Sequence, residues 1–139
     1  MLPLVMCIDD DSIVQMLSEI ILLENNFCEK IIPALDGKEG LNYFLIQKLL
    51  PLNMQKIPSL IFLDINMPIM DGWDFLATFN EEFTTFHQQI KVIILSSSEN
   101  PADIKKAKAN SLVLDFIPKP LEAIHLDKLK TSDWFKAYF

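Results

Sequence analysis

The sequence predicts an α/β protein with a doubly wound, five-stranded parallel sheet that carries helices on both faces. Short apolar runs alternate with helical patterns along the whole chain, which is typical of consecutive strand–helix–strand units. The runs are continuously apolar, as in strands that are covered on both sides. The chain has 139 residues, 50% of them apolar, which is the size of one domain around one core.

The five expected strands are the apolar runs at residues 4–8, 30–34, 60–63, 92–95 and 112–117. Between the first two runs, apolar residues recur at the spacing of an amphipathic helix, namely Ile13, Met16, Leu17, Ile20 and Ile21. Ser12 with Gln15 has the pattern of a capping box at the start of this helix. The first strand and helix therefore form one unit of the predicted fold.

Each later helix has its own signal. Asp36 with Glu39 begins the second helix, and Asp71 is the expected N-cap of the third. Asn100 followed by Pro101 begins the fourth. The fifth is indicated by three apolar residues, Leu121, Ile124 and Leu129. Aromatic residues in segment 131–139 predict a short C-terminal helical extension that packs on the domain, and we expect residues 1–139 to form a single domain.

Charge and cysteine content exclude several classes of function. The 19 acidic and 12 basic residues give a net charge of −7, which repels nucleic-acid phosphates, so we expect no direct DNA binding. Cys7 and Cys28 lack metal-ligand spacing, which favours free thiols in a reducing compartment. The chain has no secretory start and no run of the roughly 20 apolar residues that span a bilayer. We therefore predict a cytoplasmic location without membrane contact.

Polar side chains follow the expected strands where each strand ends. Asp9 and Asp10 follow the first strand, Asp64 the third, Ser96 the fourth and Lys119 the fifth. In an open parallel sheet the ligand site lies beyond the carboxyl ends of the strands. With the strand order 2-1-3-4-5, these five residues converge on one place.

Three neighbouring carboxylates repel one another unless a cation lies between them. Their hard oxygen ligands suit Mg²⁺, or Mn²⁺ in its place. A carboxylate in such a site can attack a phosphoryl group and form an aspartyl phosphate. Asp64 is best placed as the nucleophile, Asp9 and Asp10 as metal ligands, and Lys119 and the Ser96 hydroxyl as partners of the phosphoryl oxygens. Asp11 is better explained as the residue that starts the first helix.

At these residues the sequence resembles the receiver domains of two-component response regulators, including the chemotaxis type. Four motifs occur in order over essentially the whole chain: CIDDD, LDINMPIMDGW, VIILSSS and FIPKPL. The resemblance implies the flavodoxin-like form of the fold. Position 96 carries serine where threonine is as common in the family, and position 116 carries phenylalanine where many members have tyrosine.

The resemblance also implies functional roles. Asp64 accepts phosphate, Asp9 and Asp10 belong to the acid pair, and the main-chain carbonyl of Asn66 is a metal ligand. Ser98 and Asn66 border the path of the water that hydrolyses the phosphoryl group. The Lys119–Pro120 bond is expected to be cis.

These residues predict a phosphorylation-dependent switch in a two-component system or phosphorelay. The phosphoryl group comes from a phosphohistidine on a sensor histidine kinase or a histidine phosphotransfer protein. Phosphorylation draws in Ser96, Phe116 rotates, and the face of the fourth helix, fifth strand and fifth helix changes its affinity for a separate downstream protein. We expect no output domain.

Three alternatives compete with this prediction. A Mg²⁺-dependent phosphohydrolase of the haloacid dehalogenase type also uses an aspartate nucleophile, but it needs a second acid where this chain has Asn66. A binding module that takes no phosphate is disfavoured by the complete set of Asp64, Ser96 and Lys119. Nucleotide or flavin binding is disfavoured because the chain has 3 glycines and no glycine-rich loop after its first strand. The prediction is therefore a switch and not a turnover enzyme.

Overall fold

The computed structural model describes the whole chain, residues 1–139, and shows five parallel strands and five α-helices in alternation. The strands are β1 (Leu2–Ile8), β2 (Cys28–Ala34), β3 (Leu60–Leu63), β4 (Lys91–Ser96) and β5 (Val113–Pro118). The helices are α1 (Ser12–Glu24), α2 (Gly37–Leu49), α3 (Gly72–Glu82), α4 (Pro101–Ala109) and α5 (Ala123–Lys130). Three short 3₁₀ turns lie at Leu52–Met54, Thr84–Phe86 and Lys136–Tyr138. The predicted strands differ from the observed ones by at most two residues at either end.

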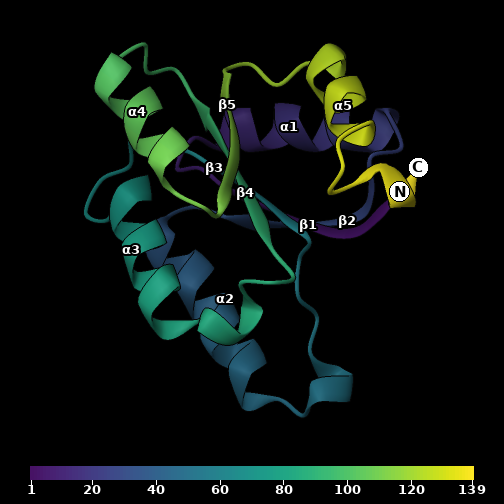
Figure 1. The fold of residues 1–139 in the computed structure, drawn as a ribbon, viewed down its shortest axis with the longest axis vertical. Coiled ribbons are helices and arrows are strands. Elements are labelled where there is room, and N and C mark those ends of the chain that lie inside the picture. The colour runs from purple at the N-terminus through teal and green to yellow at the C-terminus, as the bar shows by residue number, and fades with distance from the viewer.

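The strands form one sheet in the order β2-β1-β3-β4-β5 (Figure 1). Ile8, at the end of β1, pairs with Ala34 of β2 on one side and with Leu63 of β3 on the other. The carboxyl ends of β1 and β3 therefore lie side by side. The structure confirms the doubly wound, flavodoxin-like fold with the predicted strand order.

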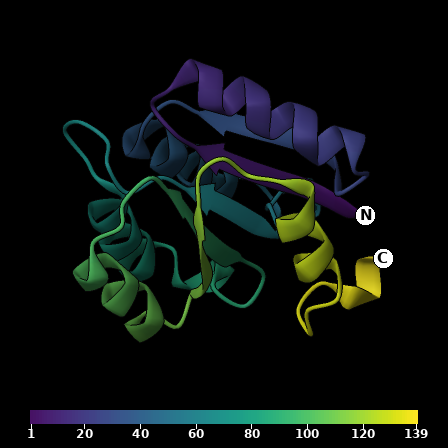
Figure 2. The same ribbon diagram turned by 90° about the horizontal axis from the view of Figure 1, so that it is seen from above.

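The helices form two layers on opposite faces of the sheet (Figure 2). On the face covered by α2, α3 and α4, the core contains a group of phenylalanines in which the ring centroids of Phe44 and Phe79 are 5.0 Å apart. On the other face, α1 and α5 pack through residues such as Leu22, Leu126 and Leu129. Strands with apolar side chains on both faces need both layers, which is why their sequences are continuously apolar.

The sequence predicts the first residues of four helices, and the structure confirms three of these predictions. The side chains of Asp36, Asp71 and Asn100 each accept a hydrogen bond from a backbone N–H in the first turn of α2, α3 and α4. The capping box of Ser12 with Gln15 was wrong. Asp11 is the N-cap of α1, and its carboxylate accepts hydrogen bonds from two backbone N–H groups of the first turn. This confirms the prediction that Asp11 starts the first helix.

Helix α1 is present where its periodicity predicts it, but the strongest apolar stripe faces away from the sheet. Ile13, Met16, Leu17 and Ile20 are 45–64% exposed. The buried residues of α1 are Gln15, Ser18 and Leu22. The predicted helix is therefore present, but of the five residues that indicated it only Ile21 packs against the core, and α1 presents an exposed apolar surface.

The last residues return to the amino-terminal end of the sheet. Segment 131–139 contains a short 3₁₀ helix, Lys136–Tyr138, and within this segment Phe135 is buried while Trp134 is half-exposed. The Met1 amino group donates a hydrogen bond to the Tyr138 carbonyl, so the two chain ends meet (Figure 1). None of the helices combines the length and the apolar character needed to cross a membrane.

Candidate functional site

Three carboxylates meet at the carboxyl ends of β1 and β3. Oxygen atoms of Asp9, Asp10 and Asp64 all lie within 4.8 Å of one another. Asp9 and Asp64 are only 5% and 4% exposed, whereas Asp10 is open to solvent. Hard oxygen donors at this spacing fit a divalent cation such as Mg²⁺. The structure therefore brings together the three acids that the sequence singles out.

The backbone around the acids is fixed by the sheet and by one buried amide. The backbone N–H of Asp64 donates to the Ile8 carbonyl at 2.9 Å, which ties β3 to β1. The Gln15 amide donates to the carbonyl oxygens of Cys7, Asp9 and Ala34, at 2.9, 3.2 and 2.9 Å. Gln15 therefore holds the ends of β1 and β2 against α1. Sequence reasoning missed this role because the spacing of Gln15 suggested a helix cap.

Lys119 closes the site from β5. Its ammonium lies 2.7 Å from an Asp9 carboxylate oxygen and 3.5 Å from an Asp64 oxygen. Its backbone N–H donates to the Ser96 carbonyl at 3.0 Å, and the Lys119–Pro120 peptide is cis. The lysine thus points into the acid cluster and not into bulk solvent.

Burial and charge act in opposite directions on these groups. Burial raises the pKa of Asp64, and so does the negative charge of Asp9, while Lys119 and the Asn66 backbone N–H oppose the rise. Burial acts to lower the pKa of Lys119, but its bonds and charge pairing with Asp9 and Asp64 outweigh this, so the pKa is raised. Lys119 therefore stays charged, but its single positive charge does not balance the negative charges of three carboxylates, and more positive charge is needed. A divalent cation would supply it.

The loop after Asp64 is shaped by close packing at Gly72. A Cβ atom at this position would lie 2.6 Å from the Asp64 carbonyl oxygen and 2.8 Å from the Ile65 Cα. The φ angle of Gly72 is not positive, so glycine is needed for space and not for backbone freedom. The exposed Asn66 donates its backbone N–H to an Asp64 carboxylate oxygen at 3.4 Å. This bond orients Asp64 toward the acid cluster.

The remaining predicted residues lie on the β4 and β5 side. Ser96 is fully buried, and its hydroxyl oxygen accepts a hydrogen bond from the Ser98 backbone N–H at 3.1 Å. Phe116 is partly buried and lines a 290 Å³ hollow between α4 and β5, together with Ile104 and Ala107. The Ser98 hydroxyl donates to Asp103 in α4 at 2.6 Å. The Ser98 hydroxyl is therefore engaged with α4, and its position beside the water path stays a prediction.

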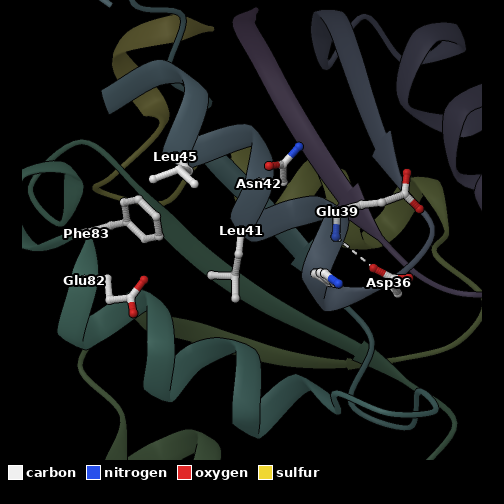
Figure 3. A pocket seen from close by; sticks show the side chains of 8 residues that line it. Asp36, Glu39, Leu41, Asn42, Leu45, Glu82 and Phe83 are labelled. Carbon is white, nitrogen blue, oxygen red and sulfur yellow. Dashed lines mark hydrogen bonds between the residues drawn. The ribbon is translucent and has the colours of Figure 1, made fainter. Parts of the chain in front are cut away.

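A larger hollow than the one beside Phe116 lies elsewhere. It has a volume of about 520 Å³ and opens between α2 and the end of α3 (Figure 3). Asp36, Glu39, Leu45 and Phe83 are among the residues around it, and none of the clustered acids is. The candidate site is therefore defined by its converging charged groups and not by the size of a cavity.

Comparison with known proteins agrees with this geometry. The family model of the response regulator receiver domain matches residues 5–130. The solved structure of a two-component response regulator from Cytophaga hutchinsonii is 33% identical, covers 92% of this chain and 93% of its own, and superposes with a TM-score of 0.84. A CheY-like receiver domain protein from Methanospirillum hungatei JF-1 is 29% identical, with 91% and 90% coverage and a TM-score of 0.64.

One curated relative is a protein-glutamate methylesterase/protein-glutamine glutaminase from Bacillus subtilis. It is 30% identical over 132 residues, which is 93% of this chain and 32% of the relative. The chain thus spans about a third of the length of the curated relatives it matches. Because the family model covers nearly all of the chain, this protein belongs to the response regulator receiver domain family of two-component systems.

Proposed function

We propose that this receiver domain is a phosphorylation-dependent switch that accepts a phosphoryl group on Asp64. The observation that carries the proposal is the convergence of Asp64, Asp9, Asp10 and Lys119, with the lysine ammonium 3.5 Å from an Asp64 oxygen. Such a set stabilises the charge that develops during phosphoryl transfer. Residues 1–139 act in this proposal as one domain, with segment 131–139 as its C-terminal extension.

The reaction begins with a phosphohistidine on a sensor histidine kinase or a histidine phosphotransfer protein. A carboxylate oxygen of Asp64 forms a bond to phosphorus as the bond from phosphorus to the histidine nitrogen breaks, and the electron pair leaves with the imidazole. Lys119 and the Ser96 hydroxyl donate hydrogen bonds to the phosphoryl oxygens. Asn66 borders the path of the water that later hydrolyses the product.

The donor set fits a resident metal ion. Asp9, Asp10, Asp64 and the Asn66 carbonyl would hold Mg²⁺ or Mn²⁺. When bound, the ion supplies positive charge that offsets the buried carboxylates and the incoming phosphoryl oxygens. The raised pKa of Asp64, caused by its burial and by Asp9, supports this need for a cation.

The exposed surface of α1 supports docking of a protein donor beside the site. Ile13, Met16, Leu17 and Ile20 form an apolar stripe that begins next to Asp10 and Asp11. Helix α1 contains glutamates but no lysine or arginine. An amphipathic helix with basic flanks has the matching chemistry, and a helix that carries the phosphohistidine would place it near Asp64.

The α4–β5–α5 face binds the downstream protein in this proposal. When Ser96 moves toward the phosphoryl group, Phe116 turns into the space that Ser96 vacates, and the affinity of this face for a downstream protein changes. The 290 Å³ hollow beside Phe116 supports such a change, because it provides room for repacking between α4 and β5. We place this exchange in the cytoplasm, where the buried Cys7 and Cys28 remain free thiols.

The catalysis is limited to the domain's own phosphorylation and dephosphorylation. A phosphohydrolase needs an acid that exchanges a proton at position 66, and Asn66 carries an amide. Sustained release of phosphate from small phosphate esters would indicate an enzyme, whereas one phosphoryl group per chain indicates a switch.

The test is the intact mass after incubation with acetyl phosphate and Mg²⁺. We expect one phosphoryl increment on the native chain and none on Asp64→Asn. Asp10→Asn is the matched variant, because it removes a neighbouring carboxylate but leaves the nucleophile, so it should be labelled more slowly. Equal labelling of the native chain and Asp64→Asn would contradict the proposal.

A further inference from the structure

A chain of side-chain hydrogen bonds joins the end of β4 to α4 and α3. The Ser98 hydroxyl donates to one carboxylate oxygen of Asp103 at 2.6 Å. The Trp73 indole N–H donates to the other Asp103 oxygen at 3.2 Å. Ser98 lies in the loop after β4, Asp103 in the first turn of α4, and Trp73 in the first turn of α3. We call these three residues the Ser98–Asp103–Trp73 clasp.

The clasp is connected to the phosphorylation site through Ser96. The Ser98 backbone N–H donates to the Ser96 hydroxyl oxygen at 3.1 Å, and Ser96 is fully buried. The hydroxyl that must reach the phosphoryl group is therefore tied to the residue that the clasp holds. A movement of Ser96 toward Asp64 must either stretch this bond or draw the loop away from α4.

Hydrogen bonds to a charged acceptor are the strong class, and the clasp contains two of them. All three side chains are partly shielded from solvent, which strengthens the bonds further. No lysine lies within ion-pair distance of Asp103, so Ser98 and Trp73 are its side-chain partners. The ammonium of Lys106, in the next turn of α4, lies 5.6 Å from the centre of the Trp73 ring and makes a second contact between α4 and Trp73.

We propose that the clasp stabilises the unphosphorylated arrangement and opens when Ser96 engages the phosphoryl group. Asp103 is then a positioning residue, which acts on the site through Ser98 and Ser96. Opening would free the first turn of α4 from α3, and this links Asp64 to the α4–β5–α5 face by a second route besides Phe116. The inference depends on the proposed function of Asp64.

Beryllium fluoride with Mg²⁺ serves as the phosphoryl analogue, and bound fluoride is counted by ¹⁹F NMR. Ser98→Ala removes one hydrogen bond of the clasp. The half-saturating concentration of beryllium fluoride should fall about tenfold, because this factor corresponds to the free energy of one hydrogen bond to a charged group. Asp103→Asn should act in the same direction.

The matched controls are Ser97→Ala and Glu99→Gln. They change exposed neighbours whose side chains make no hydrogen bond, and both should leave the half-saturating concentration unchanged. Ser98→Thr keeps the hydroxyl and should restore the native midpoint.

Trp73 reports the clasp directly. The chain has two tryptophans, so Trp134→Phe leaves Trp73 as the single indole. Its emission should shift when beryllium fluoride saturates the site, because the indole loses its carboxylate partner. An unchanged Trp73 emission at saturation, or a Ser98→Ala midpoint equal to or weaker than the native one, would overturn the clasp. If no fluoride binds to the native chain at all, the proposed function fails and the inference fails with it.

Discussion

At the scale of single residues, ionising the Asp64 carboxyl group costs more free energy in the folded protein than in the unfolded chain. Burial and the neighbouring Asp9 raise its pKa above the ordinary value of 3.8. A carboxyl group with a raised pKa destabilises the folded state once it ionises. This loss of stability is absent at low pH. It grows as the pH rises through the pKa that Asp64 has in the unfolded chain, and it is complete above the pKa that Asp64 has in the folded protein.

Replacing this carboxylate should therefore stabilise the protein. We expect Asp64→Asn to raise the free energy of unfolding at pH 7, without divalent cations, by about 1 kcal/mol. The gain should vanish toward about pH 3, where Asp64 is protonated in both states. Urea denaturation at the two pH values measures it, with the exposed Glu24→Gln as the control. A lower stability of Asp64→Asn at pH 7 would show that Lys119 compensates the carboxylate fully.

Ile69 is strained in the loop that follows Asp64. Its φ angle is 71°, in a region that branched side chains rarely adopt, and its side chain is fully exposed. The Met70 backbone N–H donates to the Pro68 carbonyl at 2.8 Å, which closes a tight three-residue turn around Ile69. The side chain has no buried contact that could offset the strain.

Asparagine tolerates this conformation better than isoleucine does. We expect Ile69→Asn to raise the free energy of unfolding by about 1 kcal/mol. Thermal and urea denaturation would measure the change, and Ile13→Asn, at another exposed isoleucine with ordinary helical geometry, should give no gain. If Ile69→Asn were destabilising, the isoleucine would have to contribute contacts that its exposure does not indicate.

At the scale of whole elements, the strands and the helix starts could be predicted, but the orientation of α1 could not. Strand positions follow from short branched apolar runs, and caps follow from local side-chain bonds. Helix α1 is apolar on most sides, so its periodicity selects a stripe without fixing which side meets the sheet. The carbonyl oxygens at the ends of β1 and β2 need a buried donor, and Gln15 supplies it. Tertiary hydrogen bonding thus overrides the apolar pattern.

The same limit applies to the candidate site. Asp9, Asp10, Asp64 and Lys119 could be placed together because the carboxyl ends of parallel strands share one edge. Contacts between Ser98, Asp103 and Trp73 could not, because they depend on the path of the loop after β4. That path is set by packing between α3 and α4 and has no signature in residue spacing.

The orientation of α1 can be tested by its stability profile. Leu22→Ala removes a fully buried side chain and should cost about 2–5 kcal/mol. Leu17→Ala changes a residue that is 51% exposed and should cost less than about 0.5 kcal/mol. Urea denaturation of both variants compares the two faces of the same helix. A larger cost at Leu17 than at Leu22 would mean that the apolar stripe, and not Gln15 and Leu22, covers the sheet.

At the scale of the whole molecule, the two chain ends close the amino-terminal edge of the sheet, opposite the acid cluster. Phe135 is buried among the residues beneath α1 and α5. Phe139 lies with its ring centroid 5.4 Å from that of Phe27, and the Lys91 ammonium at the start of β4 lies 4.2 Å from the centre of the Trp134 ring. The C-terminal segment therefore completes a core that β1, β2 and β4 leave open at this edge.

We expect this arrangement to keep the stability of the fold separate from the proposed phosphorylation of Asp64. Phe135→Ala should lower the free energy of unfolding by about 3–5 kcal/mol, the usual cost of emptying a buried phenylalanine site. Trp134→Ala, at the half-exposed neighbour, should cost only about 1 kcal/mol. The fraction of Phe135→Ala that stays folded should still take one phosphoryl group from acetyl phosphate, because Asp64 and Lys119 lie at the other edge. A cost below about 1 kcal/mol for Phe135→Ala would mean that the segment lies on the surface without closing the core.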